Sequence, residues 1–368
     1  MMKMAPIVAE MRRHVDLHPV LVHTGQHYDF SMSDVFLKQL KLGEPDFNLR
    51  VGSGNHHTQT AQIMKSFGEL VQSHHPDLIV VAGDVNSTMA CALVGAKEMI
   101  PVAHVEAGLR SFDRTMPEEV NRVVTDALSD LLFTTESSAE KNLAREGVPA
   151  HKIFFTGNVM IDSLVGALDT ARRSSVLRQL GIRPAKYALL TLHRPSNVDD
   201  PERFAATLQA VAQIAEELPV VFSVHPRTVS RLVDSGIART WDPAVSIGDH
   251  GVWTMPPASY LDFLCLMDSA AFVMTDSGGV QEETTFLGVP CLTYRDNTER
   301  PVTVTDGTNR LIGTRPENLV TEARKVLGSA RHGGRNGPPP LWDGHSAERI
   351  VGHIRKFFQK ASAHAAHG

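Results

Sequence analysis

Short apolar runs alternate along the chain with amphipathic stretches, and this pattern predicts strands that alternate with helices. Four of the predicted strands, 78–81, 101–105, 188–192 and 220–224, end on polar residues or glycine. Such an alternation is typical of parallel sheets, so we expect an α/β protein. In open α/β sheets ligands bind beyond the carboxyl ends of the strands. The polar residues therefore collect where a binding site is expected.

The pattern falls into two blocks, and 368 residues are enough for two domains of ordinary size. We predict two doubly wound, Rossmann-like domains that face a cleft. The first would span residues 1–167 and carry the candidate carboxylates, and the second would span 168–346. A final amphipathic helix and tail, 347–368, could pack on either of them.

Composition narrows the class of protein. A hydrophobic content of 42% with 21% charged residues is that of a globular chain, and a net charge of −5 argues against a nucleic-acid partner. No segment approaches the roughly 18 apolar residues of a membrane span. Three widely spaced cysteines indicate buried thiols and a cytoplasmic location. The histidines lack the spacing of a zinc site, so we expect no metal.

The most informative segment is 275–283, which follows the apolar run 271–274. Gly278 and Gly279 lie at a strand-to-helix turn, where the backbone can approach a ligand and the first N–H groups of the helix suit a phosphate. Glu283, one turn later, can accept hydrogen bonds from ribose hydroxyls. A simple tight turn is the alternative, but the polar run 295–301 favours a sugar-nucleotide site.

Three acids in the first block are candidates for proton transfer. Asp84 follows a predicted strand, where it could equally cap the next helix. Glu106 comes directly after a buried strand, so it needs a partner or a function. Glu118 and Glu119 open a helix after Pro117, and for Glu119 a favourable interaction with the helix dipole is sufficient.

Cationic and imidazole groups complete this set of candidates. Arg122, one turn into the same helix, can clamp a phosphate or a carboxylate. His193 and His225 each follow a strand of the second block, and either alone could be structural. Three acids and two imidazoles that face one cleft would suit proton transfer and stabilisation of a leaving group.

These residues belong to motifs that resemble the bacterial and archaeal non-hydrolysing UDP-N-acetylglucosamine 2-epimerases. The motifs run in order over nearly the whole chain: 24–27, 83–84, 104–110, 117–122, 156–158, 193–194, 224–226, 276–283 and 295–301. The resemblance implies the two-domain glycosyltransferase-B fold and the interconversion of UDP-GlcNAc and UDP-ManNAc for cell-surface polysaccharide. It implies elimination of UDP to 2-acetamidoglucal and re-addition, without a metal or other cofactor, in a homodimer.

The resemblance also assigns residues. The catalytic positions are Asp84, Glu106, Glu118 and His193. The positions that bind the UDP-sugar are Lys3, Arg122, Phe263 (against uracil), Ser277, Gly278, Gly279 (at the diphosphate), Glu283 (at the ribose) and Arg300. Bacterial members carry a second UDP-GlcNAc as an allosteric activator, and Gln26, Arg194 and His225 match parts of that site. A partner arginine of that site has no evident counterpart here, so allosteric dependence is left open.

The start of the chain departs from the family pattern. Members begin with an apolar strand and a Gly-Thr-Arg-Pro-Glu loop before the segment that matches Lys3–Pro6. We therefore expect that translation begins upstream of Met1. A chain that did lack this strand would have reduced stability and weakened UDP binding.

Three other functions fit parts of the pattern. The first is a hydrolysing 2-epimerase that releases UDP and free ManNAc, although the complete motifs at 117–122 and 295–301 favour the non-hydrolysing form. The second is a sugar transferase on the same fold, for which three acids in the first block are more than a simple transfer requires. The third is a nucleotide-sugar-binding protein that has lost catalysis.

Overall fold

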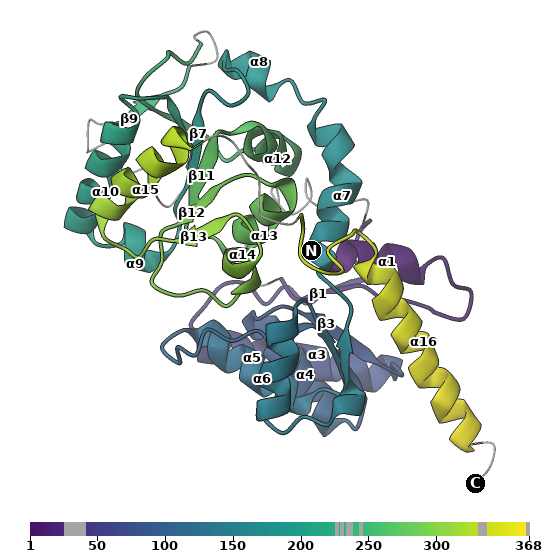
Figure 1. Cartoon of the computed structure of the whole chain (residues 1–368). Coiled ribbons are helices and arrows are strands. Elements are labelled where there is room, and N and C mark those ends of the chain that lie inside the picture. The colour runs from purple at the N-terminus through teal and green to yellow at the C-terminus, as the bar shows by residue number, and fades with distance from the viewer. Residues whose placement is uncertain are drawn as a thin grey trace. The chain divides into compact units, whose positions relative to one another are not determined.

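The computed structural model describes residues 1–25, 42–224, 228, 232, 238–242, 246–329 and 337–365. The chain divides into two compact units (Figure 1). The first unit comprises Met1–Ser163 together with Pro340–Gly368, and the second comprises Leu164–Pro339.

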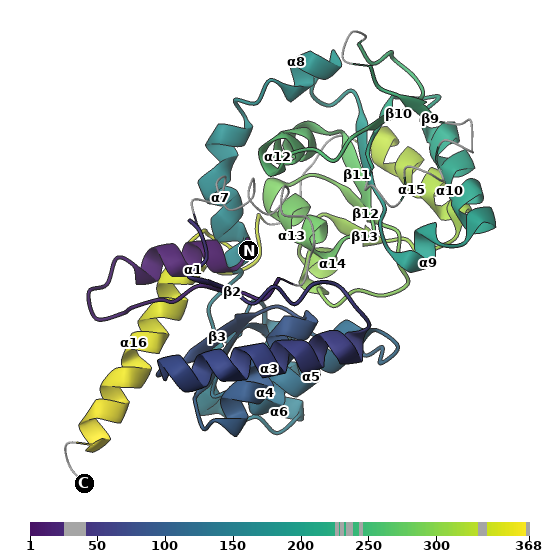
Figure 2. The same cartoon turned by 180° about the vertical axis from the view of Figure 1, so that it is seen from behind.

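The first unit is built on parallel strands. Its strands are β1 (Val22–His23), β2 (Phe47–Asn48), β3 (Ile79–Ala82), β4 (Val102–Ala107), β5 (Leu131–Thr134) and β6 (Ile153–Phe155). Strands β3 to β6 pair in chain order, while β1 and β2 form a separate two-stranded sheet. Its helices are α1 (Met4–Met11), α3 (His56–His74), α4 (Asn86–Lys97), α5 (Pro117–Leu128), α6 (Ser137–Arg145), a 3-10 turn (Ala150–Lys152), the start of α7 (Val159–Ala171) and α16 (Ser346–Ala365). Helix α4 packs between α3 and α5 (Figure 2).

The last helix belongs to the core of the first unit. Ile350, Val351 and Ile354 of α16 are buried against Ile7 and Met11 of α1 and against side chains of β4 and β5. The amphipathic pattern of the C-terminal segment is thus explained by a partner near the N-terminus (Figure 1). Asp162 fixes the start of this helix, because its carboxylate accepts the backbone N–H groups of Ser346 and Ala347 at 3.1 and 2.7 Å.

The second unit contains a seven-stranded parallel sheet in the order β13-β12-β11-β7-β8-β10-β9. The strands are β7 (Ala188–Thr191), β8 (Val220–Ser223), β9 (Ala238–Thr240), β10 (Val252–Met255), β11 (Phe272–Thr275), β12 (Cys291–Thr293) and β13 (Asn309–Leu311). The helices are α8 (Val176–Leu180), α9 (Pro195–Val198), α10 (Pro201–Ile214), α12 (Tyr260–Ser269), α13 (Gly278–Leu287), α14 (Val302–Thr305) and α15 (Pro316–Gly328). Helices α10 and α15 cover one face, and α12 and α13 lie on the other (Figure 1).

This strand order places a topological switch point between β7 and β11. The chain runs from β7 to β8 on one side, and then returns to lay β11, β12 and β13 on the other side. At such a point the connections after two adjacent strands diverge and leave a crevice at their carboxyl ends. The residues that follow β7 and β11 therefore occupy the position where this fold binds ligands.

The predicted fold class is confirmed, because all strand ladders in the described ranges are parallel and are covered by helices. The four predicted strands correspond to β3, β4, β7 and β8, with ends that differ by at most two residues. A search of the described residues finds no helix long and apolar enough to cross a membrane.

Candidate active site

Asp84 lies in the turn that follows β3, and two residues of α5 hold it in place. Gly83, with a φ of +77°, provides the left-handed backbone that this turn requires. The Asp84 carboxylate pairs with the Arg122 guanidinium, and its backbone carbonyl accepts a hydrogen bond from Asn121 Nδ2 at 2.9 Å. Val85, not Asp84, is the N-cap residue of α4. The capping alternative for Asp84 is therefore wrong.

Glu106 lies at an irregular point of β4. Its φ is +74°, and the register between β4 and β5 shifts between Val105 and Ala107. The side chain is 3% exposed, and its carboxylate forms an ion pair with Lys3. A Cβ atom added to Gly83 would lie 2.8 Å from the same Lys3 ammonium. Lys3 is thus next to both the Glu106 carboxylate and the turn that carries Asp84.

Helix α5 contributes two acids in different environments. Glu118 is exposed, whereas Glu119 is buried and accepts the backbone N–H groups of Ser111 and Phe112, both at 2.9 Å. Burial alone would raise the pKa of Glu119, but the hydrogen bonds from Ser111 and Arg122 lower it below its ordinary value. Glu119 thus orders the loop before α5, a role beyond the helix-dipole interaction expected from the sequence.

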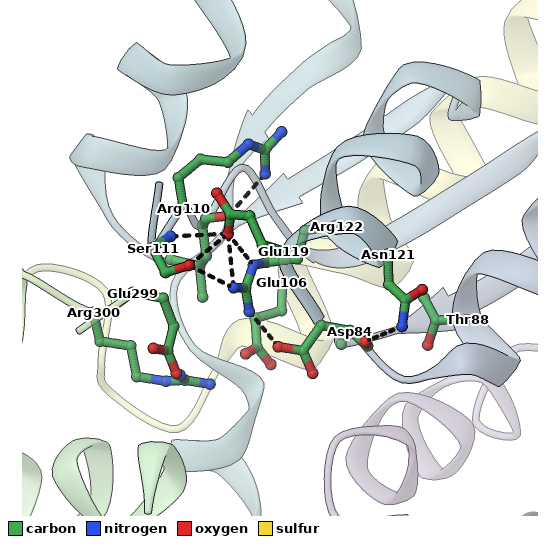
Figure 3. Close-up of polar contacts among 12 residues, drawn as sticks. Asp84, Thr88, Glu106, Arg110, Ser111, Glu119, Asn121, Arg122, Glu299 and Arg300 are labelled. Carbon is green, nitrogen blue, oxygen red and sulfur yellow. Dashed lines mark hydrogen bonds and ion pairs between the residues drawn. The ribbon is translucent and has the colours of Figure 1, made fainter. Parts of the chain in front are cut away.

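Arg122 joins these acids. Its guanidinium is buried and contacts Asp84 on one side and Glu119 on the other (Figure 3). Both carboxylates belong to the chain itself, so the expected role of Arg122 as a clamp for a phosphate or a carboxylate in the cleft stays a prediction.

His193 follows β7 and lies beside Asp276, which follows β11. The Nδ1 atom of His193 is 3.0 Å from Asp276 Oδ1, and about half of the His193 side chain is exposed. Asp276 is fully buried and also accepts the backbone N–H of Arg194 at 2.9 Å and Asn197 Nδ2 at 3.0 Å. Burial would raise the pKa of Asp276, but His193 and these hydrogen bonds lower it. An ionised Asp276 therefore orients the imidazole at the switch point of the sheet.

Helix α13 begins immediately after this aspartate. Ser277 is its N-cap residue, and the helix starts at Gly278. A Cβ atom at Gly278 would lie 2.6 Å from the Arg300 guanidinium, so glycine is needed for this close approach. Arg300 forms ion pairs with Glu299 and with Glu282, the latter at 2.8 Å. Helix N–H groups and a guanidinium thus lie together, as an anion-binding site requires.

Glu283 is buried farther along α13. The Tyr260 hydroxyl donates a hydrogen bond to Glu283 Oε1 at 3.2 Å. Burial raises the pKa of Glu283 to about 8, despite this hydrogen bond, which lowers it. Phe263 is half-buried on α12, the helix that Tyr260 begins.

A family model described as UDP-N-acetylglucosamine 2-epimerase matches residues 9–355, almost the whole chain. The chain belongs to this family.

Relatives and solved structures of this epimerase family match the chain over nearly its full length. The UDP-N-acetylglucosamine 2-epimerase of Methanocaldococcus jannaschii is 41% identical over 95% of this chain and 94% of its own length. A crystal structure of that enzyme with UDP-GlcNAc and UDP superposes with a TM-score of 0.85, covering 96% of each chain at 40% identity. A UDP-2,3-diacetamido-2,3-dideoxy-D-glucuronate 2-epimerase of Pseudomonas aeruginosa is 39% identical over 85% of this chain.

Two of the three residues that match the family's allosteric site, Gln26 and His225, lie outside the described residues. The third, Arg194, donates its Nε–H to the backbone carbonyl of Asp276 at 2.9 Å. The allosteric role stays a prediction for all three. Among the residues that the structure describes, no group of three or more histidine, cysteine or acidic side chains could hold a metal.

Sequence reasoning missed the groups that support this family's motif residues. Asp276 and His104 stand within the motifs without an expected role of their own, and Asp126 lies outside them. One signal was available for Asp276, because it directly follows a buried apolar run, as Glu106 does. The partners themselves lie on other elements, so the sequence does not reveal which residues pair.

Proposed function

We propose that this chain interconverts UDP-GlcNAc and UDP-ManNAc by inverting C2 of the sugar. The observation that carries the proposal is the set of carboxylates at the ends of β3 and β4 and at the start of α5. Asp84 and Glu106 each have a cation beside them, and Glu118 is exposed to solvent. Inversion at a carbon needs proton acceptors and donors on opposite faces, and carboxylates can serve as both.

The proposed reaction is an elimination followed by re-addition. One carboxylate removes the proton from C2, the C–H electrons form the C1=C2 double bond, and the bond from C1 to the phosphate oxygen breaks. The products of this step are 2-acetamidoglucal and UDP. The phosphate oxygen then adds back to C1, while C2 receives a proton on the opposite face. The assignment of Asp84, Glu106 and Glu118 to the two faces is left open.

The second unit would hold the nucleotide. Ser277, Gly278 and Gly279 would bind the diphosphate through the N-terminus of α13. Arg300, which Glu299 and Glu282 already pair, would donate hydrogen bonds beside it. Glu283 would accept hydrogen bonds from the ribose.

The remaining assigned side chains would contact the base and balance charge. Phe263 would pack on uracil. His193, oriented by Asp276, would stabilise the negative charge that develops on the departing phosphate. Lys3 and Arg122 would hold the carboxylates of Glu106 and Asp84 in place through their ion pairs.

Incubation with UDP-GlcNAc in heavy water tests this proposal. We expect UDP-GlcNAc and UDP-ManNAc to appear together with deuterium at C2, followed by NMR and mass spectrometry. Free ManNAc with UDP would instead identify the hydrolysing reaction. An absence of both deuterium exchange and product, with UDP-GlcNAc still bound, would overturn the proposal in favour of a binding protein.

A second candidate substrate should be tested in the same assay, because the Pseudomonas relative is named for a 2,3-diacetamido glucuronate sugar. That sugar undergoes the same inversion at C2 but carries a further acetamido group and a carboxylate. Comparing kcat/KM for the two UDP-sugars under identical conditions distinguishes them. We expect the higher value for UDP-GlcNAc, and the opposite ranking would reassign the substrate.

We further propose a homodimer in the cytoplasm, working on a nucleotide sugar for cell-surface polysaccharide. Val120 and Val123 are exposed on α5, and an apolar helix face of this kind suits contact with a second copy. All three cysteines are free and buried, which fits a reducing compartment. Analytical ultracentrifugation of the wild type and of a Val120→Glu variant would test the dimer.

A further inference from the structure

A buried charged network lies between β4 and α5 and takes no part in the mechanism above. Its centre is Asp126, near the end of α5, which is 2% exposed. Asp126 Oδ1 lies 2.6 Å from His104 Nδ1, and His104 is completely buried. Asp126 Oδ2 accepts the backbone N–H of Gly108 at 3.0 Å and pairs with Arg110 at 2.7 Å. One carboxylate thus makes three contacts with the same stretch of chain.

These contacts lie on both sides of Glu106 along the chain. His104 precedes Glu106 by two residues, and Gly108 follows it by two residues. Between them the backbone of Glu106 has a φ of +74°, a conformation that non-glycine residues rarely adopt. Such a conformation persists only where the surrounding structure enforces it. Asp126 holds both sides of this residue and so supplies that enforcement.

The network also reaches the turn that carries Asp84. His104 Nε2 donates a hydrogen bond to the backbone carbonyl of Gly83 at 2.9 Å. The other ring nitrogen, Nδ1, faces the Asp126 carboxylate, so the ring joins an acceptor on each side. Burial would raise the pKa of Asp126, but His104 and Arg110 lower it, which keeps Asp126 ionised. Asp126 therefore connects through the His104 ring to Gly83, the residue before Asp84.

Arg110 gives Asp126 a buried cationic partner. The Arg110 guanidinium also binds Glu146 with two hydrogen bonds, at 2.8 and 2.6 Å, in addition to its ion pair with Asp126. A buried ion pair whose hydrogen bonds are made can stay rigid, whereas removal of one member leaves an uncompensated charge.

We propose that Asp126 is a positioning residue that fixes Glu106 and Asp84 in one geometry for proton transfer at C2. It touches neither substrate nor reacting atoms in this role, and acts through His104, Gly108 and the strained backbone of Glu106. The inference rests on the proposed function for its catalytic consequence. Its structural part, the control of the Glu106 backbone, is independent of that function.

The test is the Asp126→Asn variant, compared with Asp130→Asn as a matched control. Asp130 accepts the backbone N–H of Val102 at the opposite end of β4, at 3.2 Å. We expect Asp126→Asn to lower kcat and deuterium exchange at C2 by about 100-fold, since small displacements of reacting groups have effects of this size, with KM changed less than about threefold. The primary isotope effect on C2-deuterated substrate should increase. Asp130→Asn should match the wild type in all four quantities.

Crystal structures of the variants test the control of the Glu106 backbone separately from its catalytic consequence. In Asp126→Asn we expect the φ of Glu106 to relax to negative values, and in Asp130→Asn it should stay positive. A folded Asp126→Asn with wild-type kcat, or with an unchanged Glu106 backbone, would overturn the inference. If the wild type does not act on UDP-GlcNAc, the proposed function fails. The φ of Glu106 in the variants then still tests whether Asp126 controls this backbone.

His104→Gln provides a second variant if Asp126→Asn does not fold. Glutamine can still donate to the Gly83 carbonyl, but it cannot also donate to Asp126. The connection between Asp126 and the turn that carries Asp84 is then broken. We expect kcat to fall by about tenfold or more with KM little changed. Wild-type kcat in a folded His104→Gln would contradict a positioning role for the network.

Discussion

His193 Nδ1 and Asp276 Oδ1 lie 3.0 Å apart, and the two residues follow the adjacent parallel strands β7 and β11. With Nδ1 committed to a buried carboxylate, the Nε2 atom is the one available to a ligand. The same carboxylate accepts the backbone N–H of Arg194 and so fixes the main chain that carries the imidazole. A single aspartate at the switch point therefore sets both the position and the orientation of His193.

The first prediction concerns Asp276→Asn. The amide can donate a hydrogen bond to His193 Nδ1 and would favour the ring form with hydrogen on Nε2, without the negative charge that supports an imidazolium. In the serine protease triad the same change lowers kcat by about 10⁴, and here we expect at least about 100-fold, because His193 stabilises rather than transfers. Steady-state kinetics measure this loss. Asn197→Ser is the control, since it removes one contact of Asp276 but keeps His193, and a comparable loss there would contradict the assignment.

The second prediction separates stability from catalysis at Arg122. Arg122→Met leaves buried Glu119 without its cation, and unpairing a buried ion pair costs about 3–5 kcal/mol. The double variant Arg122→Met/Glu119→Gln carries no unpaired buried charge there, so part of the free energy of unfolding should return. Its kcat should stay low, because Asp84 has still lost its guanidinium. Denaturant unfolding and kinetics on the two single variants and the double variant test this. A parallel recovery of both quantities would be inconsistent with it.

The family and the parallel α/β fold were predictable because their signals are local. Apolar runs such as 271–274 define strands, and Gly278 with Gly279 marks the start of a helix. The partners of the site residues were not predictable. Asp276 meets His193 across 83 positions, and Arg122 meets Asp84 across 38. Contacts at such separations depend on strand order and helix packing, which hydrophobic periodicity does not encode.

The third prediction uses two glycines with the same backbone. Gly147 and Gly157 both have a φ of +83°. A Cβ atom at Gly157 would lie 2.1 Å from the carbonyl oxygen of Leu341. At Gly147, no atom of the described residues other than its chain neighbours would lie within 4 Å. Gly147→Ala should therefore lower the free energy of unfolding only by the strain of a left-handed backbone at alanine, about 1–2 kcal/mol. Gly157→Ala should cost about 1–3 kcal/mol more through overpacking. Equal losses in the free energy of unfolding would mean that the Leu341 segment moves away without cost.

The last prediction concerns two buried glutamates of the second unit with opposite pH dependence. The pKa of Glu283 is raised to about 8 by burial, so between pH 4.5 and 8 the unfolded chain releases a proton that the folded chain retains. This group therefore lowers the free energy of unfolding by about 1.4 kcal/mol for each step of one pH unit within that range. Glu283→Gln removes this pH dependence. The free energy of unfolding of the variant minus that of the wild type should therefore increase up to pH 8 and then level off.

Glu299 should behave in the reverse way. Burial would raise its pKa, but Arg300 and Arg295 hold it well below the ordinary value. It therefore contributes stability that is fully present above pH 4.5 and is lost as pH falls through its folded pKa. Glu299→Gln should be less stable than the wild type at about pH 7, and the difference should shrink in acid. Denaturant unfolding at half-unit steps measures both variants, from about pH 4 to 9 for Glu283→Gln and down to about pH 2 for Glu299→Gln. A pH-independent difference for Glu283→Gln would show that Glu283 is ionised in the folded chain.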